Sequence, residues 1–361
     1  MVEQASGPLS GLRILEFESR DTVPLTGMVL ADMGADVVRV RRGGPDAGAM
    51  IPSLYRGRME LTLDLSTHAG RAAAVALVER ADALVEGFAP GIMEKLGLGP
   101  EQCLERNPAL AYCRLSGWGR EGPFAGMQGT DINYLAISGA LHAIGPAGAP
   151  IPPLALLADF AGGGLMMAMG LIAAVFRARD SGQGQVVDVS KLGGAAALMS
   201  MYYSLHASGH WPDRRAANMT DGGAPFYRCY SCSDARYIAV GALEPGQFAA
   251  LCDRLGIAKD RFSQYDRAGW GDMTTVFAAI FASRTRDAWE VHFEGADACV
   301  TPVLALAEAP HHPHNEAARV FGFPSGSVQP MPVPNFSVTP ASVRESTPAT
   351  IDTLLSRWDR N

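Results

Sequence analysis

The apolar and polar positions in the first third of the chain predict strands that alternate with helices. Short apolar or alternating runs have the length of buried strands; they cover 12–17, 36–40, 61–65, 83–86 and 110–115. Segments with helical spacing separate these runs; they cover 24–33, 71–81 and 100–105. Strands that recur with helical connections form parallel βαβ units, and ligands of such sheets bind beyond the carboxyl ends of the strands.

The pattern changes near residue 222. Two runs with strand character, 226–232 and 237–242, flank a short polar turn and predict an antiparallel hairpin. Helical spacing follows at 246–255 and 273–281. We therefore expect three parts, which are a large domain over 1–222, a smaller α+β domain over 223–305, and a proline-rich segment over 306–361 that returns to the large domain or wraps over another surface.

Composition narrows the classes of function. The 361 residues are 48% hydrophobic, which is enough for one large core or two moderate ones. The net charge of −7 is spread along the chain without a basic stripe, which argues against nucleic acid. Apolar stretches such as 171–176 fall short of the roughly 20 residues that span a bilayer. With no secretory signal at the N-terminus, we expect a cytoplasmic protein without a membrane partner.

Motifs for common cofactors are missing from the expected places. No G-x-G-x-x-G follows the first strand and no P-loop lysine motif is present, so we do not expect the sheet to bind NAD or ATP in the usual way. Cys229 and Cys232 form a C-x-x-C pair, but the surrounding residues favour a strand and a structural role. The histidines of 310–314 are interrupted by prolines, and we predict no metal site.

One stretch with chemical potential is 157–164, where Asp159 precedes the glycines at 162–164 and a long apolar helix. The carboxylate of Asp159 has two possible roles. It can cap free N–H groups at a helix start, or it can act as a base or a nucleophile. The glycines allow another backbone or a ligand to approach closely.

Two further stretches are candidates. Thr130 suits a helix N-cap and Asp131 the first turn, an arrangement that points free N–H groups outward, where they can stabilise an enolate oxygen. Glu244 ends a predicted strand before Pro245, where the alternatives are a solvated loop glutamate and a functional carboxylate.

Taken together, these stretches resemble the superfamily of family III CoA-transferases and α-methylacyl-CoA racemases. The matching segments run in order along nearly the whole chain, at 11–16, 31–38, 63–65, 117–119, 129–134, 159–164, 182–189 and 221–225. The chain length favours the racemase branch over the longer transferases, and so do the segments 141–145, 297–303 and 330–334.

The resemblance implies an α/β fold, with a Rossmann-like large domain built on a parallel sheet, a small α+β domain and an interlocked homodimer. It also implies an acyl-CoA substrate and no cofactor beyond the CoA moiety. Arginine forks and a lysine charge suit phosphate oxygens. The implied CoA contacts are Arg42, Arg56, Leu63, Asp64, Leu65, Gly87, Phe88, Lys95, Gly129 and Tyr134.

The resemblance also assigns catalytic positions. In the racemases a histidine assisted by a glutamate faces one side of the substrate and an aspartate faces the other. The aspartate matches Asp159, the glutamate matches Glu244, and the oxyanion site matches the backbone N–H of Asp131. The histidine position matches Thr130, whose hydroxyl lacks the basicity of an imidazole near neutral pH. The segment 18–24 also departs from the family, which has a glycine-rich loop there.

Three functions follow from this set. The first is α-proton removal and return through an enolate, either as racemisation or in a one-base form such as double-bond isomerisation or dehydration. The second is CoA transfer, with Asp159 as the nucleophile that forms a mixed anhydride. The third is CoA binding without catalysis, against which the presence of both Asp159 and Glu244 argues.

Overall fold

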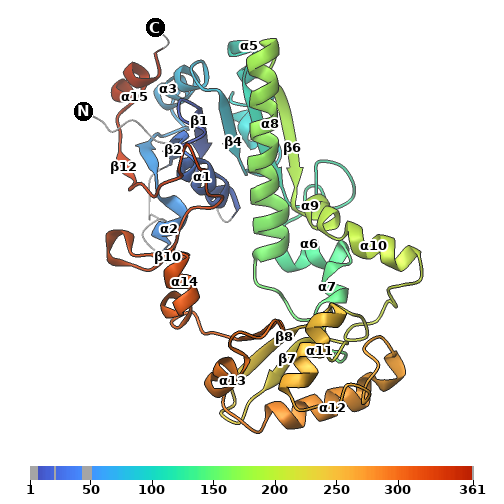
Figure 1. The fold of residues 1–361 in the computed structure, drawn as a ribbon. Helices are drawn as coiled ribbons and strands as arrows, with labels where there is room; N and C mark the ends of the chain where they lie inside the picture. Colours follow the sequence, from blue (N-terminus) through green and yellow to red (C-terminus); the bar gives the residue numbers. More distant parts are fainter. Residues whose placement is uncertain (1–6, 20–21, 43–50, 360–361) are drawn as a thin grey trace. The chain divides into compact units, whose positions relative to one another are not determined.

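The computed structural model describes residues 7–19, 22–42 and 51–359 and divides the chain into two compact units. The first unit comprises Met1–Ser138, Leu154–Met199 and Ala317–Asn361. The second comprises Gly139–Pro153 and Ser200–Glu316. Figure 1 shows the elements of each unit along the chain.

A seven-stranded sheet forms the centre of the first unit, and all its strand pairs are parallel. Its order is β12-β3-β2-β1-β4-β5-β6, in which β1 to β6 follow the usual Rossmann arrangement. The strands are β1 (Arg13–Phe17), β2 (Asp36–Arg41), β3 (Arg58–Thr62), β4 (Ala83–Glu86), β5 (Ala111–Ser116), β6 (Gln185–Ser190) and β12 (Thr347–Pro348). The predicted α/β class with a parallel sheet is confirmed.

Helices cover both faces of this sheet because successive strand residues point to opposite sides. Ile14 packs with α1 (Thr22–Asp32) and α8 (Met166–Ser181), whereas Leu15 faces a second core that includes α3 (His68–Val78) and α15 (Ile351–Trp358). The remaining elements of the unit are α2 (Pro52–Tyr55), α4 (Ile92–Lys95), α5 (Pro100–Arg106), α6 (Asp131–Ile137), η2 (Leu156–Leu165), α9 (Lys191–Leu198), β10 (Phe321–Gly322), η5 (Pro324–Gly326) and β11 (Gln329–Pro330).

The third strand begins earlier than its apolar pattern predicts. We expected it over 61–65, but β3 spans Arg58–Thr62. Arg58 is fully buried and donates to the carboxylate of Glu16 over 3.1 Å, while Glu60 pairs with Arg39 at 3.2 Å. Charged residues hide this strand from a hydrophobicity pattern, because their burial depends on partners in other strands of the sheet.

One continuous helix, Leu156–Ser181, is long and apolar enough to cross a membrane by length and composition alone. The apolar stretch recognised in the sequence, 171–176, is only part of it. A core helix of a soluble protein passes the same test, and here Met167, Leu171 and Val175 are buried against the sheet. The expected absence of a membrane partner therefore stays a prediction.

The second unit is built on a three-stranded antiparallel sheet. The strands β7 (Tyr227–Ser231) and β8 (Tyr237–Gly241) form the predicted hairpin, and β9 (Val300–Pro302) pairs with β8. An aromatic core lies against this sheet and includes Phe226, Trp270 and Phe277. The other elements are α7 (Ala140–Ala143), α10 (Ser200–Ala207), α11 (Pro245–Arg254), η3 (Arg267–Gly269), α12 (Trp270–Phe281), α13 (Arg286–Phe293), η4 (Ala309–His311) and α14 (Pro313–Ala317). All six cysteines of the chain are free.

Arg56 holds the C-terminal segment against the rest of the first unit. Its guanidinium is 6% exposed and donates to both carboxylate oxygens of Asp32, at 2.9 and 2.5 Å. It also donates to the side chain of Gln329 at 3.1 Å and to the carbonyl of Pro330 at 2.9 Å. Burial raises the pKa of Asp32, and the Arg56 guanidinium opposes that shift.

We expect Arg56→Met to lower the free energy of unfolding by about 3–5 kcal/mol, because it leaves the Asp32 carboxylate buried without its partner. Urea denaturation near neutral pH measures this loss. The matched control is Arg80→Met, which breaks the pair with Asp359, whose side chain is 56% exposed. That change should cost less than about 1 kcal/mol. Equal losses in the two variants would contradict a structural role for Arg56.

Candidate active site

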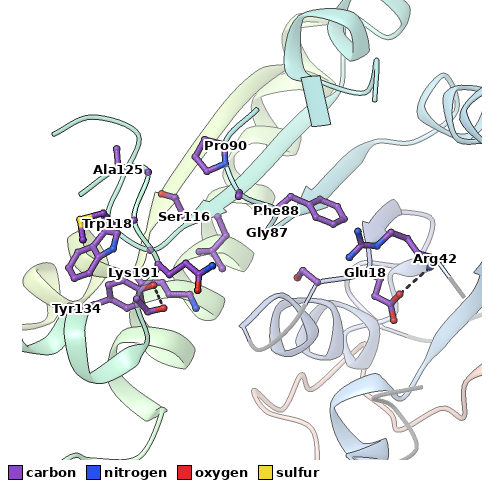
Figure 2. A pocket seen from close by; sticks show the side chains of 18 of the residues that line it. Glu18, Arg42, Gly87, Phe88, Pro90, Ser116, Trp118, Ala125, Tyr134 and Lys191 are labelled. Atoms are coloured by element: carbon purple, nitrogen blue, oxygen red, sulfur yellow. Dashed lines mark hydrogen bonds between the residues drawn. The ribbon is translucent and has the colours of Figure 1, made fainter. Parts of the chain in front are cut away.

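A cavity of about 1110 Å³ opens at the carboxyl edge of the parallel sheet (Figure 2). It is lined by residues that follow neighbouring strands: Glu18 and Ser19 after β1, Arg42 after β2, Gly87 and Phe88 after β4, Gly117 and Trp118 after β5, and Lys191 after β6. Because β1 lies beside β4 in the sheet, the cavity covers the point where the strand order reverses. Ligands of such sheets bind at this position.

One wall of the cavity is charged and aromatic. The guanidinium of Arg42 lies 4.9 Å from the ring centroid of Phe88, within the range of a cation–π contact. The backbone N–H of Arg42 donates to Glu18 over 3.1 Å, and Glu18 also accepts from Arg39 at 2.9 Å. Figure 2 shows Arg42 and Phe88 side by side on this wall. Sequence reasoning did not single out Glu18, which anchors the wall.

Five of the predicted CoA contacts line this cavity: Arg42, Gly87, Phe88, Gly129 and Tyr134. The hydroxyl of Tyr134 donates to the carbonyl of Gly129 over 2.7 Å, which holds this end of the cavity together. The other five do not line it.

Leu63, Asp64 and Leu65 follow β3 at the same edge of the sheet. Asp64 accepts from the N–H and hydroxyl of Ser66 at 2.9 and 2.6 Å, and these bonds lower its pKa. Lys95 is exposed at the end of α4. Arg56 is buried, and Asp32, Gln329 and Pro330 occupy its donors, which favours a structural role over phosphate contact.

Asp159 does not cap a helix with its side chain. It lies in the π-helix η2, and the N–H groups of Ala158 and Asp159 donate to Oδ1 of Asp131, at 2.9 and 2.8 Å. The Asp131 carboxylate therefore supplies the cap, and it leaves the side chain of Asp159 available for other contacts. Burial raises the pKa of Asp131, and its bonds to these N–H groups oppose the shift.

The glycines of η2 allow another backbone to approach, as expected from the sequence. A Cβ atom at Gly194 would lie 1.9 Å from the carbonyl oxygen of Gly162, so α9 packs directly on η2. This contact brings the first residue of α9, Lys191, to Asp159. The Lys191 Nζ lies 2.8 Å from Oδ1 of Asp159, in a contact that meets the distance of an ion pair without hydrogen-bond alignment. Sequence reasoning missed Lys191, although its position directly after β6 is a usable signal.

Thr130 occupies the N-cap position of α6, as predicted, and its side chain is exposed. Its hydroxyl donates to Oδ1 of Asn133 over 3.0 Å, and the same oxygen accepts from the Thr130 N–H at 3.0 Å. Asp131 therefore holds the first helical position, where the helix supplies no acceptor for a backbone N–H. Glu244 belongs to the second unit, where it precedes α11 with an exposed side chain. Its backbone N–H donates to Oε1 of Gln247 over 3.1 Å.

Within residues 7–19, 22–42 and 51–359, no group of three or more His, Cys, Asp or Glu side chains has an arrangement that could hold a metal ion. In the segment 310–314, His312 contacts Glu290 at 2.8 Å. Two residues of the unusual segment 18–24, Arg20 and Asp21, lie outside the described residues.

Comparison with known proteins decides the family. The model of CoA-transferase family III matches residues 9–351 of the chain. The chain belongs to CoA-transferase family III. It is 46% identical to the alpha-methylacyl-CoA racemase of Mus musculus and 44% identical to that of Homo sapiens, each time over 92% of this chain and 87% of the relative. The crystal structure of a CAIB/BAIF family protein from Brucella suis superposes with a TM-score of 0.81 and 26% identity, and covers 98% of this chain and 100% of that one. The resemblance inferred from motifs is confirmed.

In this family III protein, Glu86 is a buried carboxyl group directly before the cavity-lining Gly87. It ends β4, is 5% exposed, and accepts from the N–H of Phe88 over 2.8 Å. Burial raises the pKa of Glu86 to about 7. The folded state therefore holds the proton of Glu86 more tightly than the unfolded chain does.

We expect Glu86→Gln to flatten the pH dependence of stability. For a carboxyl group with a raised pKa, the stabilisation is complete below its unfolded value of 4.5 and is lost as pH rises through about 7. The loss amounts to about 3 kcal/mol between these limits. Urea denaturation between pH 4.5 and 8 measures the difference from wild type. The exposed Glu121→Gln is the control, and parallel curves for wild type and Glu86→Gln would contradict the burial argument.

Proposed function

We propose that this protein is an acyl-CoA isomerase of the racemase branch, which removes and returns the proton beside the thioester through an enolate. The observation that carries the proposal is the carboxylate of Asp159, which is 7% exposed and is placed by Asp131 beside the cavity-lining Lys191. The names of the two racemase relatives support the same reaction class.

In this proposal the CoA moiety binds along the cavity and needs no further cofactor. Arg42 and Phe88 offer a cation and a ring face at one end, as suits phosphate and base groups. The acyl thioester extends toward Gly129, Tyr134 and Lys191 at the other end. Figure 2 shows Arg42 and Phe88 at the opposite end of the cavity from Tyr134 and Lys191.

Asp159 acts as the base in this scheme. Its Oδ1 faces Lys191 without an aligned hydrogen bond, which leaves the carboxylate able to accept a proton. The backbone N–H of Asp131 is proposed to stabilise the enolate oxygen. The resemblance gives Glu244 the task of assisting a histidine, and with Thr130 at that position Glu244 has no imidazole to assist.

Thr130 limits the proposal to reactions that do not depend on a histidine at that position. Loss of one general base lowers a rate by roughly 10²–10⁴-fold, so two-base racemisation should be slow. One-base isomerisation or dehydration and CoA transfer are the alternatives. CoA transfer needs Asp159 only as a nucleophile, and a carboxylate that does not cap a helix suits that role as well.

Isotope incorporation from deuterated water distinguishes these reactions. Each epimer of a 2-methylacyl-CoA is incubated with the protein in deuterated water, with and without a free carboxylic acid, and analysed by mass spectrometry. We expect deuterium at the α-carbon, and its loss in Asp159→Asn. A new acyl-CoA that forms only with the added acid would instead support CoA transfer. If neither product forms with short or long acyl chains, both enzymatic functions are overturned, and the result favours a protein that only binds CoA.

CoA binding has its own test. We expect Arg42→Met to weaken CoA about tenfold or more, because a charge-assisted hydrogen bond contributes about 1.5–3 kcal/mol. Titration calorimetry at low and high salt measures the change, which should shrink as salt rises. Arg106→Met, at an arginine that is 65% exposed and pairs with Glu79 outside the cavity, is the control. An unchanged affinity in Arg42→Met would place the CoA phosphates elsewhere.

The interlocked homodimer and the cytoplasmic location stay predictions. Large apolar side chains are exposed along the outer side of η2 and α8, at Leu165, Met169 and Phe176, with exposed fractions of 48, 62 and 79%. Burial of such a strip against a second copy would remove apolar area from water.

A further inference from the structure

Lys191 is an ionisable side chain of the cavity to which the family resemblance assigns no role. Its Nζ lies 2.8 Å from Oδ1 of Asp159, and the two side chains are 13 and 10% exposed. The same Nζ lies 5.7 Å from the ring centroid of Tyr134. Figure 2 shows Lys191 beside Tyr134, at the end of the cavity away from Arg42.

The fold determines the position of this ammonium. Lys191 opens α9 directly after β6, and the N-cap Ser190 accepts from the N–H of Gly193 over 3.0 Å. A Cβ atom at Gly163 would lie 3.4 Å from Cγ of Lys191, so the stem of the lysine runs along the glycine face of η2. The ion pair therefore results from the close packing of α9 on η2 and not from a surface contact.

Lysine is rare in this chain, which has three, at positions 95, 191 and 259. Of these, Lys95 and Lys259 are exposed. Histidine does not occur among the residues that line the described cavity. Lys191 is thus an ionisable group in contact with Asp159, at the end of the cavity where the start of α6 carries Thr130 in place of a base.

We infer that Lys191 is a catalytic residue, and that Lys191 and Asp159 form a one-sided acid–base pair that exchanges the α-proton with retention of configuration. This inference rests on the proposed function. It adds two points to that function: the residue that stabilises the moving negative charge, and the stereochemical outcome of the reaction.

The step balances within the site. Oδ2 of Asp159 takes the α-proton, the C–H electron pair forms the carbon–carbon double bond of the enolate, and the thioester carbonyl pair moves onto oxygen. The negative charge passes from the carboxylate to the enolate oxygen, and the Lys191 ammonium attracts it in both places. The neutral carboxyl of Asp159 exchanges its proton with water, and in deuterated water this exchange supplies the deuterium. Asp159 then returns a proton to the same face of the carbon.

Retention follows from the geometry of the pair. Racemisation needs an acid on the opposite face of the planar enolate, and a threonine hydroxyl is a poor acid and a poor base near neutral pH. Since Lys191 contacts Asp159, both groups reach the α-carbon from one side. Repeated removal and return then labels the substrate without inverting it.

The test compares wild type with Lys191→Met and Lys191→Arg, using each epimer of a 2-methylacyl-CoA in deuterated water. Mass spectrometry gives the rate of α-deuteration, and chiral separation gives the epimer ratio. In the wild type we expect deuteration to run ahead of inversion by at least about a hundredfold, as the missing opposite base implies.

We expect Lys191→Met to lower kcat for exchange by roughly 10²-fold or more, because it removes the charge that stabilises the enolate. KM should change little, because the charge acts on the transition state. Lys191→Arg should recover part of the rate, since it restores a cation. Lys259→Met, at an exposed lysine of the second unit, is the matched control and should behave as wild type. Thermal unfolding and CoA titration of each variant separate a folding defect from a catalytic one.

Three outcomes overturn the inference. If the folded Lys191→Met variant exchanges at the wild-type rate while Asp159→Asn does not exchange, the proposed function stands and Lys191 is only a counter-ion. If wild type inverts the epimer as fast as it deuterates it, the pair is not one-sided. If wild type exchanges no α-proton on any chain length, the proposed function fails and this inference fails with it.

Discussion

The two hydrogen bonds from the N–H groups of Ala158 and Asp159 to the carboxylate of Asp131 are the interaction on which the site depends. They join α6 to the start of η2, so that the carboxylate of Asp131 acts as the cap and the carboxylate of Asp159 is left for chemistry. A buried carboxylate is costly without partners, and these bonds supply them. The rise in the pKa of Asp131 through burial shows that the cost is only partly offset.

Close backbone packing completes the site. The contact between Gly162 and Gly194 leaves no room for a side chain, because a Cβ atom at Gly194 would overlap the Gly162 carbonyl unless the helices shifted. Only this approach lets the first residue of α9 reach Asp159. The site therefore has two parts. Helix packing positions the charged pair of Lys191 and Asp159, and the ends of the strands position the wall at Arg42 and Phe88.

Buried charges also support the sheet beneath the cavity. Glu16 and Arg58 are almost fully buried on β1 and β3, the two strands that flank β2, and Arg39 of β2 connects Glu18 to Glu60. Burial raises the pKa of Glu16, and the nearby guanidinium groups oppose the shift. Such pairs contribute less to net stability than their contact distances suggest, but loss of one partner is expensive. They hold the ends of β1 and β2 in place, where Glu18 and Arg42 enter the cavity.

The sequence by itself determined the family and most of the element order. The strand at 83–86 and the hairpin around 233–235 follow from local patterns, because apolar periodicity and turn residues are local properties. The C-terminal strand β12 escaped that reading, and β3 begins earlier than predicted, since the partners that explain both lie far away along the chain. The motif around Asp159 identified a candidate carboxylate but left open whether it capped a helix. Only the tertiary structure decided that Asp131 supplies the cap and that Lys191 contacts Asp159, because a contact between residues 32 positions apart depends on how two helices pack and not on either sequence alone.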